Sequence, residues 1–332
     1  MLHRRGRTRS YPIAVLLLLL LIASALVPQF FPKNSFLLSV LILANIWAIL
    51  AMSWDILSGY AGQISFGHSF FFGLGGYTTA FLSVLYGWSP ILVIALGGVV
   101  AALGGLLIAA PALRLRGPYL SLMTLVAALA LDRLLRLLKP EIGIPGAEGA
   151  ILCIPQCLLT YNTALKYYYS LGLMILIAGA LYTLARSRIG LAFEAIRDDE
   201  EAAQAAGINT AKYKTLAFAI SGFVAGVSGA FYVYHIGSAS PSSLLDLEHS
   251  IEVIVAAVLG GMGTIIGPIF GAYFLVLVRE YLRFLGGWRF FVLFAVALLV
   301  LFFVPRGVLP ELRLKLRQWL QSGSGQRRNQ KV

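Results

Sequence analysis

Long apolar runs recur along this chain, and they constrain its fold more than any other feature. A helix needs roughly 20 mainly apolar residues to cross the hydrocarbon core of a bilayer. Hydrophobic residues make up 59% of the sequence and charged residues only 12%, which is too few to cover a soluble domain of this size. Apolar runs occur at residues 12–31, 36–57, 64–86, 90–113, 119–138, 168–185, 215–236, 249–262, 265–283 and 289–305. We therefore expect an all-α integral membrane protein with about ten transmembrane helices, forming a single domain over residues 1–332.

The eighth and ninth runs depend on one decision, because the stretch from Ser250 to Leu282 is too long for a single ordinary span. Residues that interrupt helices lie near its middle: Gly260, Gly261, Gly263, Gly267 and Pro268. We expect two helices that meet there. The resulting even number of crossings also puts the basic N-terminus and the basic tail on the same side of the membrane.

Positively charged residues are clustered, and the clusters orient the predicted helices. Lys and Arg gather in the N-terminal segment, in the loop 186–214 and in the tail 306–332. Positively charged loops stay on the inner side during insertion, so we expect all three segments to be cytoplasmic. A net charge of +12 also suggests nucleic acid, but no packed domain carries the basic residues. We therefore expect a lipid bilayer and no nucleic acid as partner.

The start of the chain and its cysteines each leave two interpretations. Ala23-Ser24-Ala25 after a leucine run resembles a signal-peptide cleavage site, but the apolar run continues to Phe31, which favours an uncleaved first helix. Cys153 and Cys157 fall in the predicted external loop 140–166, where they either form a disulfide or remain free thiols.

An acidic, alanine-rich stretch within the loop 186–214 is the strongest functional signal. It holds a cluster of carboxylates at Glu194, Asp198, Asp199, Glu200 and Glu201. The run 202–206 favours a helix, and Gly207 is well placed to end it. A short polar helix whose small residues allow close approach predicts a docking surface. A solvated loop that merely carries charge is the alternative that composition leaves open.

Four sequence blocks, in order over about residues 55 to 280, resemble one known family. They are Gly-Tyr-Ala-Gly-Gln-Ile-Ser-Phe-Gly-His from Gly59, Arg-Gly-Pro-Tyr-Leu from Arg116, Glu-Ala-Ala from Glu201 with Gly207, and Val-Leu-Gly-Gly-Met-Gly-Thr-Ile-Ile-Gly-Pro from Val258. The third block is similar to the coupling loop of ABC importer permeases. Together the four resemble the branched-chain amino-acid permease family, and the first two favour its M-type over its H-type subunit.

This resemblance implies a type II ABC-importer-like bundle, with room for an inverted repeat of helices 2–5 and 7–10. The implied partners are an H-type second permease, two cytoplasmic ABC ATPases and an extracytoplasmic substrate-binding protein. The implied role is a transport subunit of the cytoplasmic (inner) membrane, not an enzyme. Contact with an ATPase is implied for the coupling residues Glu194, Arg197, Asp198, Glu201, Ala202, Ala203 and Gly207.

Ligands follow from the same resemblance. The implied solutes are leucine, isoleucine and valine, with urea or short amides as the alternative, because the binding protein selects the ligand in this family. The chain has no GxxxxGK[ST] string for binding phosphates, so ATP would be bound by partner subunits. We expect no cofactor and no metal in this chain.

Glycine-interrupted helices mark two candidate segments of a translocation pathway. Broken helices expose backbone dipoles to a polar solute, whereas glycine also lets membrane helices pack closely. The sequence leaves both interpretations open. The candidate pathway residues are Gly62, Gln63, Ser65, Gly67, His68, Gly73, Gly76, Tyr77, Gly260, Gly261, Gly263, Gly267 and Pro268.

Isolated polar residues have plainer interpretations. We expect His68 to be a packed, hydrogen-bonded side chain and Asp55 to be a boundary residue that reaches water. Three small groups complete the set: an interfacial cluster or binding-protein contact at Glu248, His249 and Glu252, mutual pairs among Arg279, Glu280 and Arg283, and interface aromatics at Tyr167, Tyr168, Tyr169 and Trp288.

Two other function classes fit the sequence less well. An ion-driven secondary transporter usually buries an acidic coupling residue near the membrane centre, and we expect no Asp or Glu in mid-span here. A membrane-embedded enzyme would need a convergent set of catalytic groups or metal ligands. The four histidines, His3, His68, His235 and His249, are scattered along the chain.

Overall fold

All regular structure in the described part of the chain is helical, which confirms the all-α prediction. The computed structural model describes residues 35–113, 117–142 and 162–303, with isolated positions at 24, 26, 28, 29, 115, 307 and 309–311. The predictions that fall outside these residues stay predictions. They concern the basic N-terminus, most of the first predicted helix, Arg116, Cys153, Cys157 and the basic tail beyond residue 311.

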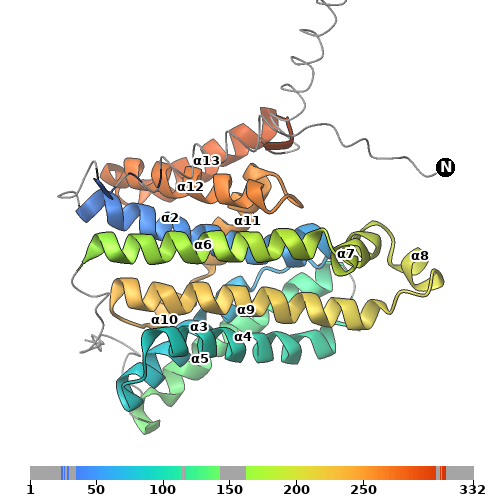
Figure 1. Cartoon of the computed structure of the whole chain (residues 1–332), viewed down its shortest axis with the longest axis horizontal. Helices are drawn as coiled ribbons and strands as arrows, with labels where there is room; N and C mark the ends of the chain where they lie inside the picture. Colours follow the sequence, from blue (N-terminus) through green and yellow to red (C-terminus); the bar gives the residue numbers. More distant parts are fainter. Residues whose placement is uncertain are drawn as a thin grey trace, which may run out of the picture.

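Six long helices form the body of the part of the chain that the structure describes. They are α2 (Ser35–Trp54), α3 (His68–Tyr86), α4 (Pro90–Ala112), α5 (Pro118–Ile142), α6 (Thr163–Ala185) and α9 (Thr210–Ile236). The shorter elements are η1 (Asp55–Tyr60), α7 (Arg188–Asp198), α8 (Glu200–Ala205), α10 (Pro241–Leu244), α11 (Leu247–Gly260), α12 (Ile266–Tyr281), η2 (Leu282–Leu285) and α13 (Trp288–Phe303). The long helices lie roughly side by side, with α7 and α8 together at one end (Figure 1).

Five stretches of the described chain are long and apolar enough to cross a membrane. They are Phe36–Tyr60, His68–Tyr86, Pro90–Pro111, Thr163–Ala185 and Thr210–Ile236. The helix α13 is apolar but shorter, α11 and α12 are each shorter than a full span, and α5 carries several charged residues. The prediction of about ten crossings therefore remains untested.

The helices α2 and α9 occupy the centre of the bundle. In its second half α2 is buried on every side, with Ile46, Ile49 and Met52 fully shielded, which is typical of a helix that is apolar all round. The helix α9 packs closely against α4 because small residues line the contact. A Cβ atom on Gly105 of α4 would lie 2.6 Å from the carbonyl oxygen of Phe218 in α9.

The predicted break in the long apolar run is confirmed. The helix α11 ends at Gly260 and α12 begins at Ile266. Between them the backbone of Gly261, Gly263 and Ile265 has positive φ angles of 114°, 74° and 54°. These angles are incompatible with a continuous helix, and glycine adopts them at little cost.

A second break differs from its prediction. The third helix begins at His68 instead of residue 64, because the chain leaves α2 through the π-helical turn η1 and then runs without helix through residues 61–67. Gly62 has a positive φ of 70° in this segment. Single π-helical turns often occur at functional sites, so this connection is a structural landmark.

The helix predicted from the run 202–206 is present as α8, and a further helix, α7, precedes it. Asp199 separates them with an extended backbone, and its carboxylate accepts hydrogen bonds at 3.0 Å from the backbone N–H groups of Glu201 and Ala202. An Asp at this position favours a new helix start over a continuous helix. Gly207 ends the second helix with a φ of 87°, as the sequence predicts.

Candidate functional site

The two helix breaks meet at the end of the bundle that carries α7 and α8, which we call the α7–α8 end. Asp55 in η1 is fully buried, and its carboxylate accepts three hydrogen bonds from the loop between α11 and α12. The donors are the backbone N–H groups of Gly263 at 2.6 Å, Thr264 at 3.2 Å and Ile265 at 3.2 Å. The expectation that Asp55 reaches water as a boundary residue is therefore wrong. The carboxylate instead fixes the shape of the loop between α11 and α12.

Arg197 connects α7 to the same place. Its Nη1 atom donates a hydrogen bond of 2.8 Å to the carbonyl oxygen of Gly59 in η1. Its Nη2 atom lies 3.0 Å from a carboxylate oxygen of Asp198. Gly62 also lies against Arg197, because a Cβ atom there would be 3.0 Å from the arginine Cα. The helix α7 is thus attached to the π-helical turn through one side chain.

A second attachment joins α8 to the body of the protein. The Nζ atom of Lys214 in α9 lies 2.6 Å from Oε2 of Glu200 at the start of α8. Lys214 is almost fully buried. On the inner side of α7, Phe193 and Ile196 are buried as well. Apolar packing and ionic contacts together hold α7 and α8 firmly against the bundle.

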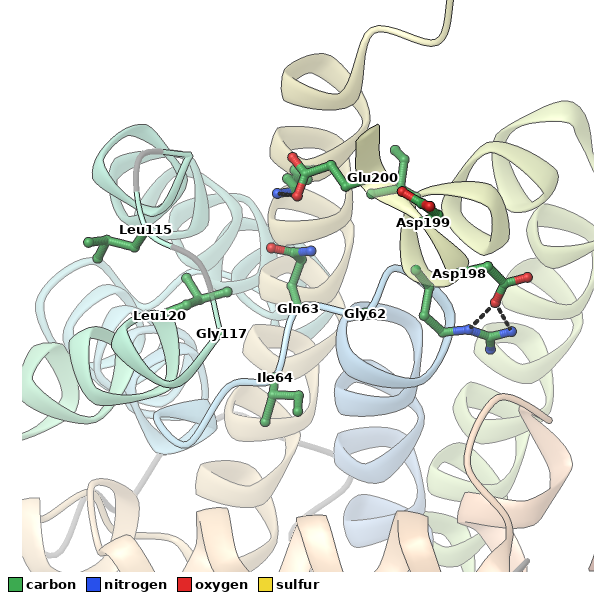
Figure 2. A pocket seen from close by; sticks show the side chains of 12 residues that line it. Gly62, Gln63, Ile64, Leu115, Gly117, Leu120, Asp198, Asp199 and Glu200 are labelled. Atoms are coloured by element: carbon green, nitrogen blue, oxygen red, sulfur yellow. Dashed lines mark hydrogen bonds and ion pairs between the residues drawn. The ribbon is translucent and has the colours of Figure 1, made fainter. Parts of the chain in front are cut away.

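A pocket of about 410 Å³ lies among these elements (Figure 2). In Figure 2, Leu115 and Leu120 lie on one side of Gln63, and Asp198 and Asp199 lie on the other. The lining residues are Gly62, Gln63, Ile64, Leu115, Gly117, Leu120, Ile196, Arg197, Asp198, Asp199, Glu200 and Lys214. The pocket therefore brings residues from the predicted pathway set together with residues from the predicted coupling set.

The other predicted coupling residues lie on α7 (Glu194) and on or next to α8, and they differ in exposure. Glu201, Ala202 and Gly207 are exposed, Glu194 is half-buried, and Ala203 is buried. The exposed side of α8 continues through Ala205 and Ala206. It presents small side chains with carboxylates beside them.

The polar residues of the first predicted pathway segment are buried. Gln63 is 8% exposed, and Ser65 and His68 are fully buried. The ring of His68 lies 3.2 Å from Oγ of Ser65 and 3.0 Å from Oγ of Ser221, which confirms that it is a packed, hydrogen-bonded residue. Tyr77 is also buried, and its hydroxyl has no hydrogen-bond partner within the described part of the chain.

The predicted pathway glycines serve close packing in this structure. Gly67 lies against the carbonyl group of Thr124, and Gly73 and Gly76 lie against the leucines at 244 and 245. At the break between α11 and α12, Gly260 lies against Gly267 and Pro268. These contacts agree with the packing interpretation that the sequence left open. A role in the pathway stays a prediction.

A buried ion pair near the middle of the bundle escaped the sequence analysis. Glu252 of α11 is only 3% exposed, and Nη1 of Arg279 in α12 lies 3.0 Å from its Oε2 atom. The indole N–H of Trp47 donates to the same oxygen at 2.6 Å. Trp47 lies within the Phe36–Tyr60 span, so the expectations of an interfacial Glu252 and of no acidic residue in mid-span are wrong. The opposite charges of Glu252 and Arg279 on two adjacent helices were the sequence signal that could have predicted this pair.

Three smaller expectations have mixed outcomes. Arg283 pairs with Glu280 at 3.1 Å as predicted, whereas Arg279 pairs with Glu252 instead. Tyr167 is buried, and its hydroxyl donates to the carbonyl oxygen of Ser24 at 2.8 Å. Its position at the membrane interface stays a prediction. Exposed aromatics do occur at Tyr168, Tyr169 and Trp288.

Comparisons with known proteins agree over most of the chain. Residues 36–303 match the family described as branched-chain amino acid transport system / permease component. The high-affinity branched-chain amino acid transport system permease protein LivM of Salmonella typhimurium is 29% identical over 305 residues, which are 84% of this chain and 70% of that protein. LivM of Escherichia coli is 29% identical over 302 residues, 83% and 70% of the two chains.

Other permeases match a smaller part. The autoinducer 2 import system permease protein LsrC of Photorhabdus laumondii is 34% identical over 143 residues, which are 40% of this chain and 42% of that protein. No solved structure matches the chain. The family match covers both helix breaks, α7, α8 and the buried ion pair. The chain therefore belongs to the family of permease components of branched-chain amino acid transport systems.

Proposed function

We propose that this chain is the M-type permease subunit of an ABC importer that carries leucine, isoleucine and valine across the cytoplasmic membrane. In this proposal α7 and α8 face the cytosol and dock on an ATPase subunit. One observation carries the docking step: α7 and α8 form a separate exposed element that is tied to the bundle at Arg197 and at Lys214. An element of this kind passes an applied force on to the helices behind it.

The surface of α8 suits a protein partner. The exposed alanines Ala202, Ala205 and Ala206 let another backbone approach closely, and Glu201 adds negative charge for specificity. The element also contains exposed Leu191 on α7. We propose that an ATPase groove with basic residues at its rim receives this surface.

The choice of substrate rests on the extent of the similarity. The two LivM proteins resemble this chain over more than four fifths of its length, whereas the LsrC and ribose permeases match 40% or less. Branched-chain amino acids are therefore the best-supported cargo. We further propose about ten crossings, an H-type permease as second subunit, two ATPases and an extracytoplasmic binding protein as partners.

The docking step is tested by placing a large charge on α8. The chain is expressed with its ATPase and second permease, and Ala202→Arg is compared with Ala211→Arg, an exposed alanine at the start of α9. We expect Ala202→Arg to lose both co-purification of the ATPase and leucine uptake, while Ala211→Arg keeps both. Full uptake by Ala202→Arg would contradict the proposal.

The sidedness is tested separately. Gln204→Cys, in a chain whose two cysteines carry Cys153→Ser and Cys157→Ser, places a single thiol on the exposed side of α8. A maleimide that cannot cross membranes should label this thiol in inside-out vesicles and not in intact cells. Labelling in intact cells would place α8 outside and refute docking on a cytoplasmic ATPase.

A further inference from the structure

A continuous set of contacts joins α7 to the break between α11 and α12. Arg197 holds the carbonyl group of Gly59, and Asp55, one turn earlier in the same π-helical segment, holds the backbone of residues 263–265. The guanidinium also interacts electrostatically with the Asp55 carboxylate. A single cation on α7 therefore acts on η1 and, through it, on the break.

These contacts leave no room for independent movement. A Cβ atom on Gly59 would lie 2.7 Å from the backbone nitrogen of Gly263, so η1 and the break touch backbone to backbone. A Cβ atom on Gly263 would lie 3.3 Å from Nη1 of Arg197. Because packed interiors transmit strain instead of absorbing it, a shift of Arg197 must move η1 and the break with it.

The backbone conformation of the break depends on contacts from outside the loop. Ile265 has a φ of 54°, a region that is rare for a β-branched residue. Such a conformation persists only when the surroundings enforce it, and the Asp55 carboxylate does so by accepting the Ile265 N–H. A substitution at Asp55 therefore changes the backbone conformation from which α12 begins.

We propose that Arg197 and Asp55 are positioning residues that carry the movement of α7 and α8 to the junction of α11 and α12. The inference rests on the proposed docking of α7 and α8, and it deepens that function by naming the route. Neither residue contacts the solute. Arg197 transfers displacement from the ATPase side, and Asp55 converts it into a change at the helix break.

The first experiment measures coupling in the complete complex. The permease, its second subunit and the ATPases are reconstituted in proteoliposomes with the binding protein, and leucine transported per ATP hydrolysed is measured. We expect Arg197→Gln to lower this ratio roughly tenfold, as for loss of a charge-assisted hydrogen bond, while ATP hydrolysis and ATPase co-purification persist. Arg197→Lys should restore part of the ratio because it keeps a donor and the charge.

The matched control removes a different cation at the same end. Lys212 is exposed at the start of α9, outside the proposed route, so Lys212→Gln should leave the ratio unchanged. Equal loss in Lys212→Gln and Arg197→Gln would show that only net charge matters, and the inference would fail.

The second experiment observes the break directly. Met262 lies in the loop between α11 and α12 and is 49% exposed, so Met262→Cys reports on this loop in the background with Cys153→Ser and Cys157→Ser. We expect trapping of the ATPases with ATP and vanadate to change the rate at which a maleimide labels this thiol. Adding Arg197→Gln or Asp55→Asn should abolish the change. If Asp55→Asn does not assemble, the result for Arg197→Gln decides. The Arg197 side chain is 37% exposed, so its replacement disturbs the packing less than replacement of the buried Asp55.

Failure of this inference is distinct from failure of the docking proposal. If Ala202→Arg keeps the ATPase and full uptake, docking itself is wrong. If docking holds but Arg197→Gln leaves both the leucine-to-ATP ratio and the labelling response of Met262→Cys at wild-type levels, movement reaches the membrane helices by another route. That outcome would overturn the inference alone.

Discussion

Asp55 and Glu252 are both carboxylates withdrawn from solvent, but the protein satisfies them with different kinds of donor. Asp55 is bound by three backbone N–H groups of one loop. Glu252 is bound by two side chains, the indole of Trp47 and the guanidinium of Arg279. The two sites lie close along one helix, since Trp47 precedes Asp55 by eight residues, or about 12 Å.

The difference decides how each site responds to mutation. Among substitutions only proline removes a backbone N–H donor, so the partners of such a carboxylate cannot be exchanged for other side chains. A pair of side chains can be exchanged as a unit for apolar residues, and such exchanges are often neutral. The Asp55 site therefore fixes one backbone conformation. The Glu252 site joins the helices α11, α12 and α2 through side chains that apolar residues can replace.

The largest effect is expected for Asp55→Ala. The substitution leaves three backbone N–H groups without their acceptor, and each buried unsatisfied donor costs about 1–3 kcal/mol. We expect the lowest apparent melting temperature of this series, measured on the detergent-purified chain by size-exclusion chromatography after heating. Asp55→Asn keeps one acceptor oxygen and should lose less.

A small loss of melting temperature in Asp55→Ala would contradict this account of the Asp55 site. If Asp55→Ala melts within about 2 °C of the wild type, corresponding to less than about 1 kcal/mol for a domain of this size, the carboxylate does not hold the loop.

The next largest effect is expected when one member of the buried ion pair is removed. Glu252→Leu leaves Arg279 without its counter-charge, and removing one partner of a buried pair costs about 3 kcal/mol or more. The double variant Glu252→Leu with Arg279→Met should recover at least half of the loss in melting temperature. Recovery stays incomplete because the Trp47 indole still loses its acceptor, at about 1 kcal/mol.

The double variant also tests whether the pair acts as a unit. If the double variant loses as much melting temperature as Glu252→Leu and Arg279→Met lose together, Glu252 and Arg279 are independent. The contrast with Asp55 then disappears.

A smaller effect is expected for Gly59→Ala. The added methyl group would overlap the Asp55 carboxylate and lie 2.7 Å from the backbone nitrogen of Gly263, and overpacking of this kind costs about 1–3 kcal/mol. Gly179→Ala in α6 is the control, because open space surrounds that position. Alanine should raise the melting temperature there, since glycine in a helix costs about 0.5–1 kcal/mol relative to alanine. Equal responses at the two positions would show that Gly59 is not crowded.

Local sequence signals predicted one part of this region and missed the other. The break near Gly261, the docking element near Ala202 and the family follow from glycine spacing, charge clusters and ordered motifs. The partners of Asp55 do not, because they are backbone groups about 210 residues later in the chain. No local pattern reveals which carboxylate will meet which loop.

The Glu252 site shows a different reason for a missed prediction. Glu252 and Arg279 have opposite charges on helices that the sequence already places next to each other, so the signal was present. Assigning Glu252 by its distance from the helix end put it at the interface, although its neighbours bury it. Depth in a helix and burial in a bundle are separate quantities, and only the second depends on packing.

The smallest effect is expected for Tyr273→Phe. The Tyr273 hydroxyl donates to Oδ1 of Asn45, whose Nδ2 atom donates to Oγ of Ser170 at 2.9 Å, so one short chain of side chains joins α12, α2 and α6. Hydrogen bonds between helices in membranes contribute about 0.6 kcal/mol on average. We therefore expect a fall in melting temperature of only about 1–2 °C, and none for Tyr281→Phe, because Tyr281 is 80% exposed. Side-chain contacts of this kind are numerous and individually weak, whereas Asp55 gathers three backbone donors on one residue. A loss in Tyr273→Phe as large as in Asp55→Ala would mean that the helices depend on their side-chain contacts as strongly as on the loop held by Asp55.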